Sequence, residues 1–204
     1  MSDQATVYIV DDEPDVCNSV VALVTSMGMV GETFSSAEDF LETFDPDRHG
    51  CLVTDLRMHG MSGLELQDHL RSQGMQLPIV FITAYADVPT TVQIMRNGAT
   101  NVLEKPFRGQ DLWESINTAI RTDAESRTIN RRAEETRQLL ERLSENERKV
   151  MDLLVAGEMN KTIAKQLGVA LRTVEQRRHD LLQKLGVDSL AALVRLSIEA
   201  EAAA

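Results

Sequence analysis

The sequence has few cysteines, no long apolar run and no basic leader, and each absence narrows the class of protein. Among its 204 residues only Cys17 and Cys51 are cysteines, and each lies in an apolar run typical of a small buried side chain rather than a disulfide. No stretch approaches the ~18 consecutive apolar residues that a membrane helix needs. Residues 1–4 show no basic region followed by an apolar run, so no secretory signal is visible. We therefore expect a cytoplasmic protein without membrane contact.

The charge is unevenly distributed along the chain. Residues 1–122 hold 7 Lys and Arg against 18 Asp and Glu, so the whole net charge of −11 lies there. Residues 123–143 hold 5 of each sign, and residues 144–204 hold 9 of each. An acidic first part repels nucleic acid and concentrates cations. A neutral C-terminal part is a weaker electrostatic indication of DNA binding than a basic one.

Short apolar runs alternate with amphipathic segments of helical length over the first 120 or so residues. The runs are 7–10, 31–34, 51–54, 79–82 and 101–103. Between them, segments such as 16–27 and 64–72 repeat apolar residues at helical spacing. Strands that alternate with helices predict βαβ crossovers, and hence an α/β fold with a doubly wound, parallel, five-stranded sheet. In that fold, ligands bind at the carboxyl ends of the strands.

A helix-forming stretch joins this part to the rest of the chain. Residues 112–143 contain neither Gly nor Pro and are rich in Ala, Glu and Arg. The polar centre, 123–132, leaves open one continuous helix or a helix frayed in the middle, and the absence of sustained heptads argues against a strong coiled coil. Beyond it the pattern is purely helical and begins with a capping box, Ser144 to Glu147. The predicted domains are 1–122, a helical linker 123–142, and an all-α domain 143–204.

Five polar residues stand at the ends of predicted strands. They are Asp11 and Asp12 after the first, Asp55 after the third, Thr83 after the fourth and Lys105 after the fifth. Carboxylates brought to one edge repel each other, and a hard cation with oxygen ligands relieves this, so Mg²⁺ is the expected cofactor. A carboxylate, a metal, a hydroxyl and an ammonium suit phosphoryl transfer to an aspartate, with Asp55 as the nucleophile. Singly, such residues also serve as helix caps or surface charges. Their coincidence favours the phosphoryl site.

Residues 5–122 resemble a response-regulator receiver domain. The matching pieces are Val10-Asp11-Asp12-Glu13, Thr54-Asp55-Leu56-Arg57-Met58, Met61-Ser62-Gly63-Leu64, Ile82-Thr83-Ala84 and Glu104-Lys105-Pro106-Phe107. The resemblance implies that Asp55 accepts a phosphoryl group from a sensor histidine kinase. The implied Mg²⁺ ligands are Asp11, Asp12, Asp55 and the backbone carbonyl of Arg57. The resemblance also implies that Thr83 and Lys105 contact the phosphoryl group, and that the bond before Pro106 is cis.

Two positions depart from the receiver pattern. Val102 stands where the family usually has Phe or Tyr, the aromatic that moves inward with Thr83 on activation, and Val is too small for that movement. Tyr85 either substitutes in part or simply covers its loop. The pair His59-Gly60 stands where a Pro is common, which changes loop stiffness. We interpret His59 as a loop-surface histidine.

Two short helices in the C-terminal part have the form of a helix-turn-helix. Residues 160–169 predict a helix ended by Gly168, and residues 172–185 a second helix with an apolar stripe and a polar face. Such a crossing places the second helix in the major groove, where Gln176 and an Arg would read base edges. The predicted DNA-binding residues are Lys161, Arg172, Thr173, Glu175, Gln176, Arg177, Arg178, His179 and Lys184. A small helical bundle with a merely solvated polar face is the alternative.

Residues 143–198 resemble the LuxR-type helix-turn-helix of FixJ/NarL response regulators. The matching pieces are Leu143-Ser144-Glu145-Asn146-Glu147, Ala156-Gly157, Asn160-Lys161-Thr162-Ile163-Ala164, Arg172-Thr173-Val174-Glu175 and Lys184-Leu185-Gly186. The resemblance implies four helices, of which the last, 189–198, commonly dimerises. Arg177 stands where the family most often has His, a change that bears on phosphate contact or base preference.

The sequence therefore predicts a response-regulator transcription factor and not an enzyme, apart from slow autodephosphorylation. Phosphorylation of Asp55 would bias the face of the fourth helix and fifth strand, release an occluded DNA-binding domain, and favour a homodimer on double-stranded DNA. DNA binding largely independent of phosphorylation is an alternative, as is an output domain that binds a protein. An aspartate-based phosphatase is a rival from another class, but it needs a second Asp where Arg57 stands.

Overall fold

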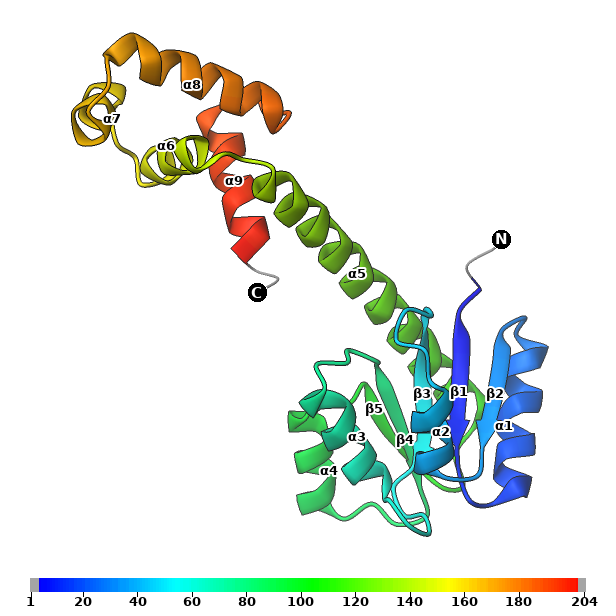
Figure 1. The fold of residues 1–204 in the computed structure, drawn as a ribbon. Coiled ribbons are helices and arrows are strands. Elements are labelled where there is room, and N and C mark those ends of the chain that lie inside the picture. The colour runs from blue at the N-terminus through cyan, green and yellow to red at the C-terminus, as the bar shows by residue number, and fades with distance from the viewer. Residues whose placement is uncertain (1–3, 202–204) are drawn as a thin grey trace. The chain divides into compact units, whose positions relative to one another are not determined.

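The computed structural model describes residues 4–201, whose helices and strands fall into two units that meet between Ser126 and Arg127 (Figure 1). The two units share one long helix. Residues 1–3, part of the N-terminal stretch that shows no secretory signal, lie outside the described residues. So do residues 202–204, the end of the third predicted domain. The predicted domain boundaries at 122 and 143 stay predictions.

The first unit contains the predicted parallel sheet. Within the described residues its strands are β1 (Thr6–Val10), β2 (Val30–Phe34), β3 (Gly50–Asp55), β4 (Ile79–Thr83) and β5 (Asn101–Glu104). They lie in the order β2-β1-β3-β4-β5, and every neighbouring pair is parallel. β1, β3 and β4 are buried along their whole length, which explains why they read as continuous apolar runs. The five strands and their doubly wound order confirm the predicted fold class.

Helices cover both faces of the sheet, as the crossover connections require. They are α1 (Pro14–Ser26), α2 (Ala37–Thr43), α3 (Gly63–Ser72), α4 (Val88–Arg96) and α5 (Gly109–Glu141). One core lies between the sheet and α2 to α4, where Phe40, Leu66 and Ile94 are fully buried. The other lies between the sheet and α1 with α5, around residues such as Val24 and Ile116. The two cores fix the sheet between helices and so hold its carboxyl edge in place.

The long helix α5 runs without interruption from the first unit into the second, so the continuous form of the predicted linker is the observed one. Near the first unit's end it is tied to the amino end of β3. The carboxylate of Asp123, 2% exposed, accepts a hydrogen bond from the backbone N–H of Gly50 at 2.9 Å. Nδ1 of His49 lies 2.5 Å from the same oxygen. A carboxylate buried with these partners anchors α5 at the edge of the sheet opposite to Asp55.

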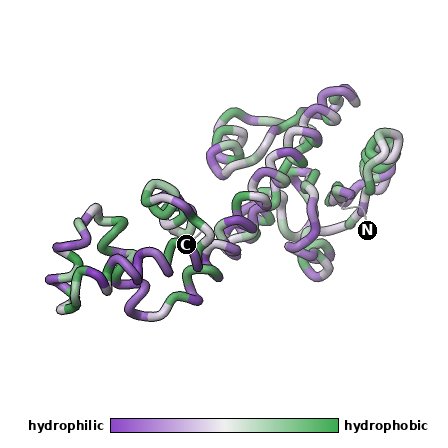
Figure 2. Tube along the Cα trace, turned by 90° about the horizontal axis from the view of Figure 1, so that it is seen from above, coloured by the Kyte–Doolittle hydropathy of each residue, from purple (hydrophilic) through white to green (hydrophobic). Residues whose placement is uncertain are grey.

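The second unit is helical, as predicted. After the last part of α5 come α6 (Glu145–Val155), α7 (Asn160–Leu167), α8 (Leu171–Lys184) and α9 (Leu190–Glu201). Gly168 ends α7 in the left-handed conformation, with φ of 66°, which suits a residue without Cβ. The core of this unit includes Leu154, Ile163, Val174, Leu181 and Leu193, all at most 1% exposed. Figure 2 shows hydrophobic and hydrophilic residues along the same helices, the pattern of helices with one buried face. Within residues 4–201, no helix is long and apolar enough to cross a membrane.

An ion pair fastens the start of α6 to the end of α8. The predicted capping box is present, because Ser144 accepts from the backbone N–H of Glu147 and Glu147 accepts from that of Ser144. The same Glu147 oxygen also accepts from Nζ of Lys184 at 2.9 Å. These contacts, the Lys184 hydrogen bond first among them, lower the pKa of Glu147 from 4.5 to about 2.

The lowered pKa of Glu147 predicts a loss of stability in acid. A carboxyl group whose folded pKa is depressed stabilises the fold above its unfolded pKa, and this stabilisation disappears as the pH falls from about 4.5 to about 2. Because the pair is partly exposed to solvent, we expect a contribution of about 0.2–1 kcal/mol to the free energy of unfolding. Urea unfolding, followed through the methyl NMR signals of Val174 and Leu193, measures it. Glu147→Gln should remove this part of the pH dependence, and an unchanged pH profile in the variant would contradict the assignment.

Candidate functional site

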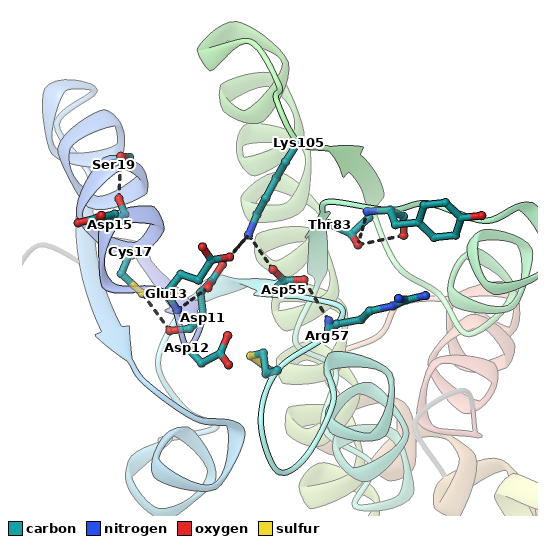
Figure 3. A network of polar contacts seen from close by, with 12 residues as sticks. Asp11, Asp12, Glu13, Asp15, Cys17, Ser19, Asp55, Arg57, Thr83 and Lys105 are labelled. Atoms are coloured by element: carbon teal, nitrogen blue, oxygen red, sulfur yellow. Dashed lines mark hydrogen bonds and ion pairs between the residues drawn. The ribbon is translucent and has the colours of Figure 1, made fainter.

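Three charged side chains meet at the carboxyl edge of the sheet (Figure 3). Asp11 follows β1, Asp55 ends β3 and Lys105 follows β5, and parallel strands bring these positions to one edge. The Nζ atom of Lys105 lies 2.6 Å from Oδ2 of Asp55 and 3.0 Å from Oδ2 of Asp11. It also lies 3.6 Å from Oε1 of Glu13. One ammonium therefore bridges carboxylates that are 94 and 50 residues away in sequence.

Burial and ion pairing have opposite effects on the pKa values of Asp11 and Lys105. Desolvation is the largest influence on Asp11 and raises its pKa, and the N–H of Glu13 and the ammonium of Lys105 only partly oppose it. For Lys105, burial disfavours the charged form, but hydrogen bonds to Asp55 and Asp11 outweigh it, so that its pKa is raised. A buried charge needs such partners. Lys105 is therefore held as a cation against the oxygens of Asp55.

The backbone around Asp55 is fixed by a close helix start. Oδ1 of Asp55 accepts from the N–H of Arg57 at 3.0 Å, which leaves Oδ2 to Lys105. The first residue of α3 is Gly63, and a Cβ placed there would lie 2.2 Å from the carbonyl oxygen of Asp55. Only glycine permits this approach. The Gly63 of the sequence motif is thus part of what positions Asp55.

The carboxylates form a group suited to a divalent cation. Oxygens of Asp11, Glu13 and Asp55 lie within 4.8 Å of one another. An all-oxygen donor set at a partly buried edge fits Mg²⁺, which prefers carboxylate and water ligands. Among the described residues, Asp12 adds no oxygen to this group, and Oδ2 of its carboxylate contacts His59. That contact, first through the His59 side chain and then its N–H, lowers the pKa of Asp12.

Two residues of this edge, Glu13 and His59, have contacts that the sequence does not predict. Glu13 was read only as part of a motif, although it stands directly after the two predicted ligands and could have been found by that position. His59 was interpreted as a loop-surface residue, and its side chain is indeed 99% exposed, but its ring contacts the Asp12 carboxylate. No sequence signal indicates that contact. The Arg57 carbonyl stays a predicted ligand.

Thr83 lies at the end of β4, 1% exposed, with its hydroxyl bonded to the backbone of its own loop. The hydroxyl donates to the carbonyl of Tyr85 at 3.1 Å and accepts from its N–H at 3.2 Å. Tyr85 is 60% exposed, and the guanidinium carbon of Arg57 lies 5.5 Å from the centroid of its ring. Val102 is partly buried against the core on the α4 side. Thr83 is thus beside the carboxylates without contacting them in this arrangement.

The polar face of α8 carries the predicted DNA-binding residues. Exposed positions are Lys161 on α7 and Arg172, Glu175, Gln176, His179 and Lys184 on α8, whereas Thr173, Arg177 and Arg178 are partly buried. Several of these side chains are held by neighbours. Gln176 donates to Asp180 at 2.8 Å, and Arg178 donates to Asn160 of α7 at 3.4 Å. Val174 and Leu181, on the opposite face of α8, are fully buried. The helix therefore buries its predicted apolar stripe and presents a polar face.

Comparison with known proteins assigns both units to families. Residues 7–117 match the response regulator receiver domain, and residues 141–197 match the luxR family of bacterial regulatory proteins. The first match alone covers more than half of the chain. The chain is a response regulator. It carries a LuxR-type DNA-binding domain and belongs with transcriptional regulators, which confirms the resemblance read from the sequence.

Relatives of this response regulator match along almost its whole length. The transcriptional regulatory protein TdiR of Thauera aromatica is 40% identical over 190 residues, which cover 93% of this chain and 84% of TdiR. The transcriptional regulatory protein FixJ of Rhizobium meliloti is 41% identical, with 95% of each chain covered. Among solved structures, the response regulator StyR is 44% identical, with a TM-score of 0.85 over 96% of this chain and 99% of StyR.

One further receiver feature is present in the response regulator. The bond between Lys105 and Pro106 is cis, as the resemblance implied.

Proposed function

We propose that Asp55 of this response regulator accepts a phosphoryl group from a sensor histidine kinase. The observation that carries the proposal is the Lys105 ammonium, 2.6 Å from Asp55 and 3.0 Å from Asp11. It keeps the Asp55 carboxylate paired with a positive charge at an edge where ligands of doubly wound folds bind. An oxygen of Asp55 forms a bond to phosphorus as the P–N bond of the donor's phosphohistidine breaks. The electron pair goes to the leaving imidazole, which takes up a proton.

The charges around Asp55 suit that transfer. The transferred group carries negative charge on three oxygens, and the ammonium of Lys105 is placed to stabilise one of them. Asp11, Asp12, Asp55 and the Arg57 carbonyl would hold Mg²⁺, with Glu13 as a further oxygen nearby. When bound, the metal supplies positive charge for the phosphoryl oxygens and for the crowded carboxylates. The hydroxyl of Thr83 would turn from Tyr85 toward the new group.

The residues around Asp55 suit a lasting phosphorylation rather than the repeated hydrolysis of a phosphate ester. An aspartate-based phosphatase needs a second Asp as acid and base two residues after its nucleophile, and Arg57 stands there, with its N–H bonded to Asp55. Hydrolysis of the phosphoaspartate would therefore be slow.

Phosphorylation adds charge at the edge that contains Thr83, and we propose that this raises the DNA affinity of a homodimer. The expected cytoplasmic location belongs to the same proposal.

Incubation of the full chain with Mg²⁺ and acetyl phosphate tests the phosphoacceptor. Intact-mass spectrometry should show one added phosphoryl group that hydroxylamine removes, and Asp55→Asn should abolish it. Asp68→Asn is the matched control, because Asp68 is an exposed carboxylate of α3 that accepts a hydrogen bond from Asn97 at the surface. The same gain of mass in the Asp55→Asn variant, or none in the parent chain, would overturn the proposal.

We further propose that α8 reads the major groove. Its amino end and polar face carry Arg172 and Gln176, while Lys161 extends the basic surface from α7. A flexible cation such as Arg172 suits phosphate contact, which positions a helix without reading sequence. An amide such as Gln176 suits an adenine edge, once its bond to Asp180 is exchanged for the base.

A DNA site selected from random duplexes by its binding to the full chain allows these two roles to be separated. Arg172→Ala should weaken binding to all sequences and reduce the slope of log affinity against log salt by about one. Gln176→Ala should cost about 1–3 kcal/mol at the selected site and relax preference at one base pair. Lys149→Ala, on α6 and paired with Glu145, is the control. Salt-insensitive binding, or equal effects of all three variants, would favour an output domain that binds a protein instead.

A further inference from the structure

His59, in the loop after β3, contacts Asp12, the second of the two predicted metal ligands that follow β1. The backbone N–H of His59 donates to Oδ2 of Asp12 at 3.1 Å. Nδ1 of the His59 ring contacts the same oxygen. The imidazole is otherwise open to solvent, with 99% of its side chain exposed, whereas the Asp12 side chain is 21% exposed. His59 therefore makes a specific contact with Asp12 through two donors rather than packing in a core.

Asp12, which makes this contact, lies outside the group of carboxylate oxygens formed by Asp11, Glu13 and Asp55. Asp11, Glu13 and Asp55 each offer an oxygen within 4.8 Å of the others, and Asp12 does not. Figure 3 shows Asp12 joined by no dashed line to Lys105 or Asp55, unlike Asp11. Mg²⁺ demands near-octahedral geometry with oxygens at about 2.0–2.1 Å, so all its ligands lie close together. Asp12 has to move toward the group before it ligates a metal.

We propose that His59 is a positioning residue that holds Asp12 away from the metal group and so lowers the affinity of the site for Mg²⁺. The inference rests on the proposed function, in which Asp12 is a ligand. Moving Asp12 inward breaks or stretches the ring contact, so the free energy of that contact is subtracted from metal binding. A Pro, common at this position in the receiver family, has neither an N–H nor a side-chain donor to offer. With His59 at this position, the site should therefore bind Mg²⁺ more weakly than it would with a Pro.

Calorimetric titration of the full chain with Mg²⁺ tests the proposal. His59→Ala removes the ring donor, and because one hydrogen bond contributes modestly, the variant should bind Mg²⁺ about two- to tenfold more tightly. His59→Asn keeps a side-chain N–H donor and should stay near the parent affinity. His69→Ala is the matched control, since His69 is an exposed histidine of α3 in the same unit. The ¹⁵N signal of His59 Nδ1 should also shift on addition of Mg²⁺ to the parent chain.

The possible outcomes distinguish a failure of the proposed role of His59 from a failure of the proposed Mg²⁺ site. Equal or weaker Mg²⁺ binding by His59→Ala, with normal binding by the parent, overturns the role of His59 alone. An affinity of His59→Asn equal to that of His59→Ala contradicts a side-chain donor. A Nδ1 signal that does not move when Mg²⁺ binds contradicts a contact that the metal breaks. No Mg²⁺ binding by the parent or any variant overturns the proposed metal site and this inference with it.

Discussion

The ammonium of Lys105 between Asp55 and Asp11 is the interaction on which the functional edge depends. The side chains of Asp55 and Asp11 are 8% and 0% exposed, and the ammonium offsets the repulsion between two carboxylates buried so close together. The sequence places the three residues at the ends of β5, β3 and β1, and the sheet order brings those ends together. The same charge that stabilises the unmodified edge is available to a phosphoryl group on Asp55, so stability and function share one side chain.

The rest of the first unit holds the residues of this edge in position. Buried helices on both faces hold the strands in register, and Gly63 lets α3 begin against the backbone of Asp55. At the opposite edge, Asp123 ties the linker helix to β3 through Gly50 and His49. One continuous helix, α5, thus belongs to the sheet at one end and to the core of the DNA-binding unit at the other, since Leu140 is buried there.

Much of this could be predicted from the sequence. The strands follow from short apolar runs, and their parallel arrangement follows from the helices between them. The capping box at Ser144 and the two helices of the helix-turn-helix follow from local helical patterns, and the structure confirms all of these. The meeting of Asp11, Asp55 and Lys105 followed from strand ends alone. Contacts made by loops did not follow, because no periodicity fixes where a loop side chain points. His59 on Asp12, Thr83 on the Tyr85 backbone, and His49 on Asp123 are of this kind.

Beryllium fluoride, a small anion that mimics a phosphoryl group on a carboxylate, offers the most direct test of the central claim. NMR spectra of the full chain should change on its addition only when Mg²⁺ is present, and the side-chain signals of Lys105 and Thr83 should shift together. The Asp55→Asn variant should show no such change. Spectral changes without Mg²⁺, or changes confined to residues away from Asp55, Thr83 and Lys105, would contradict the account.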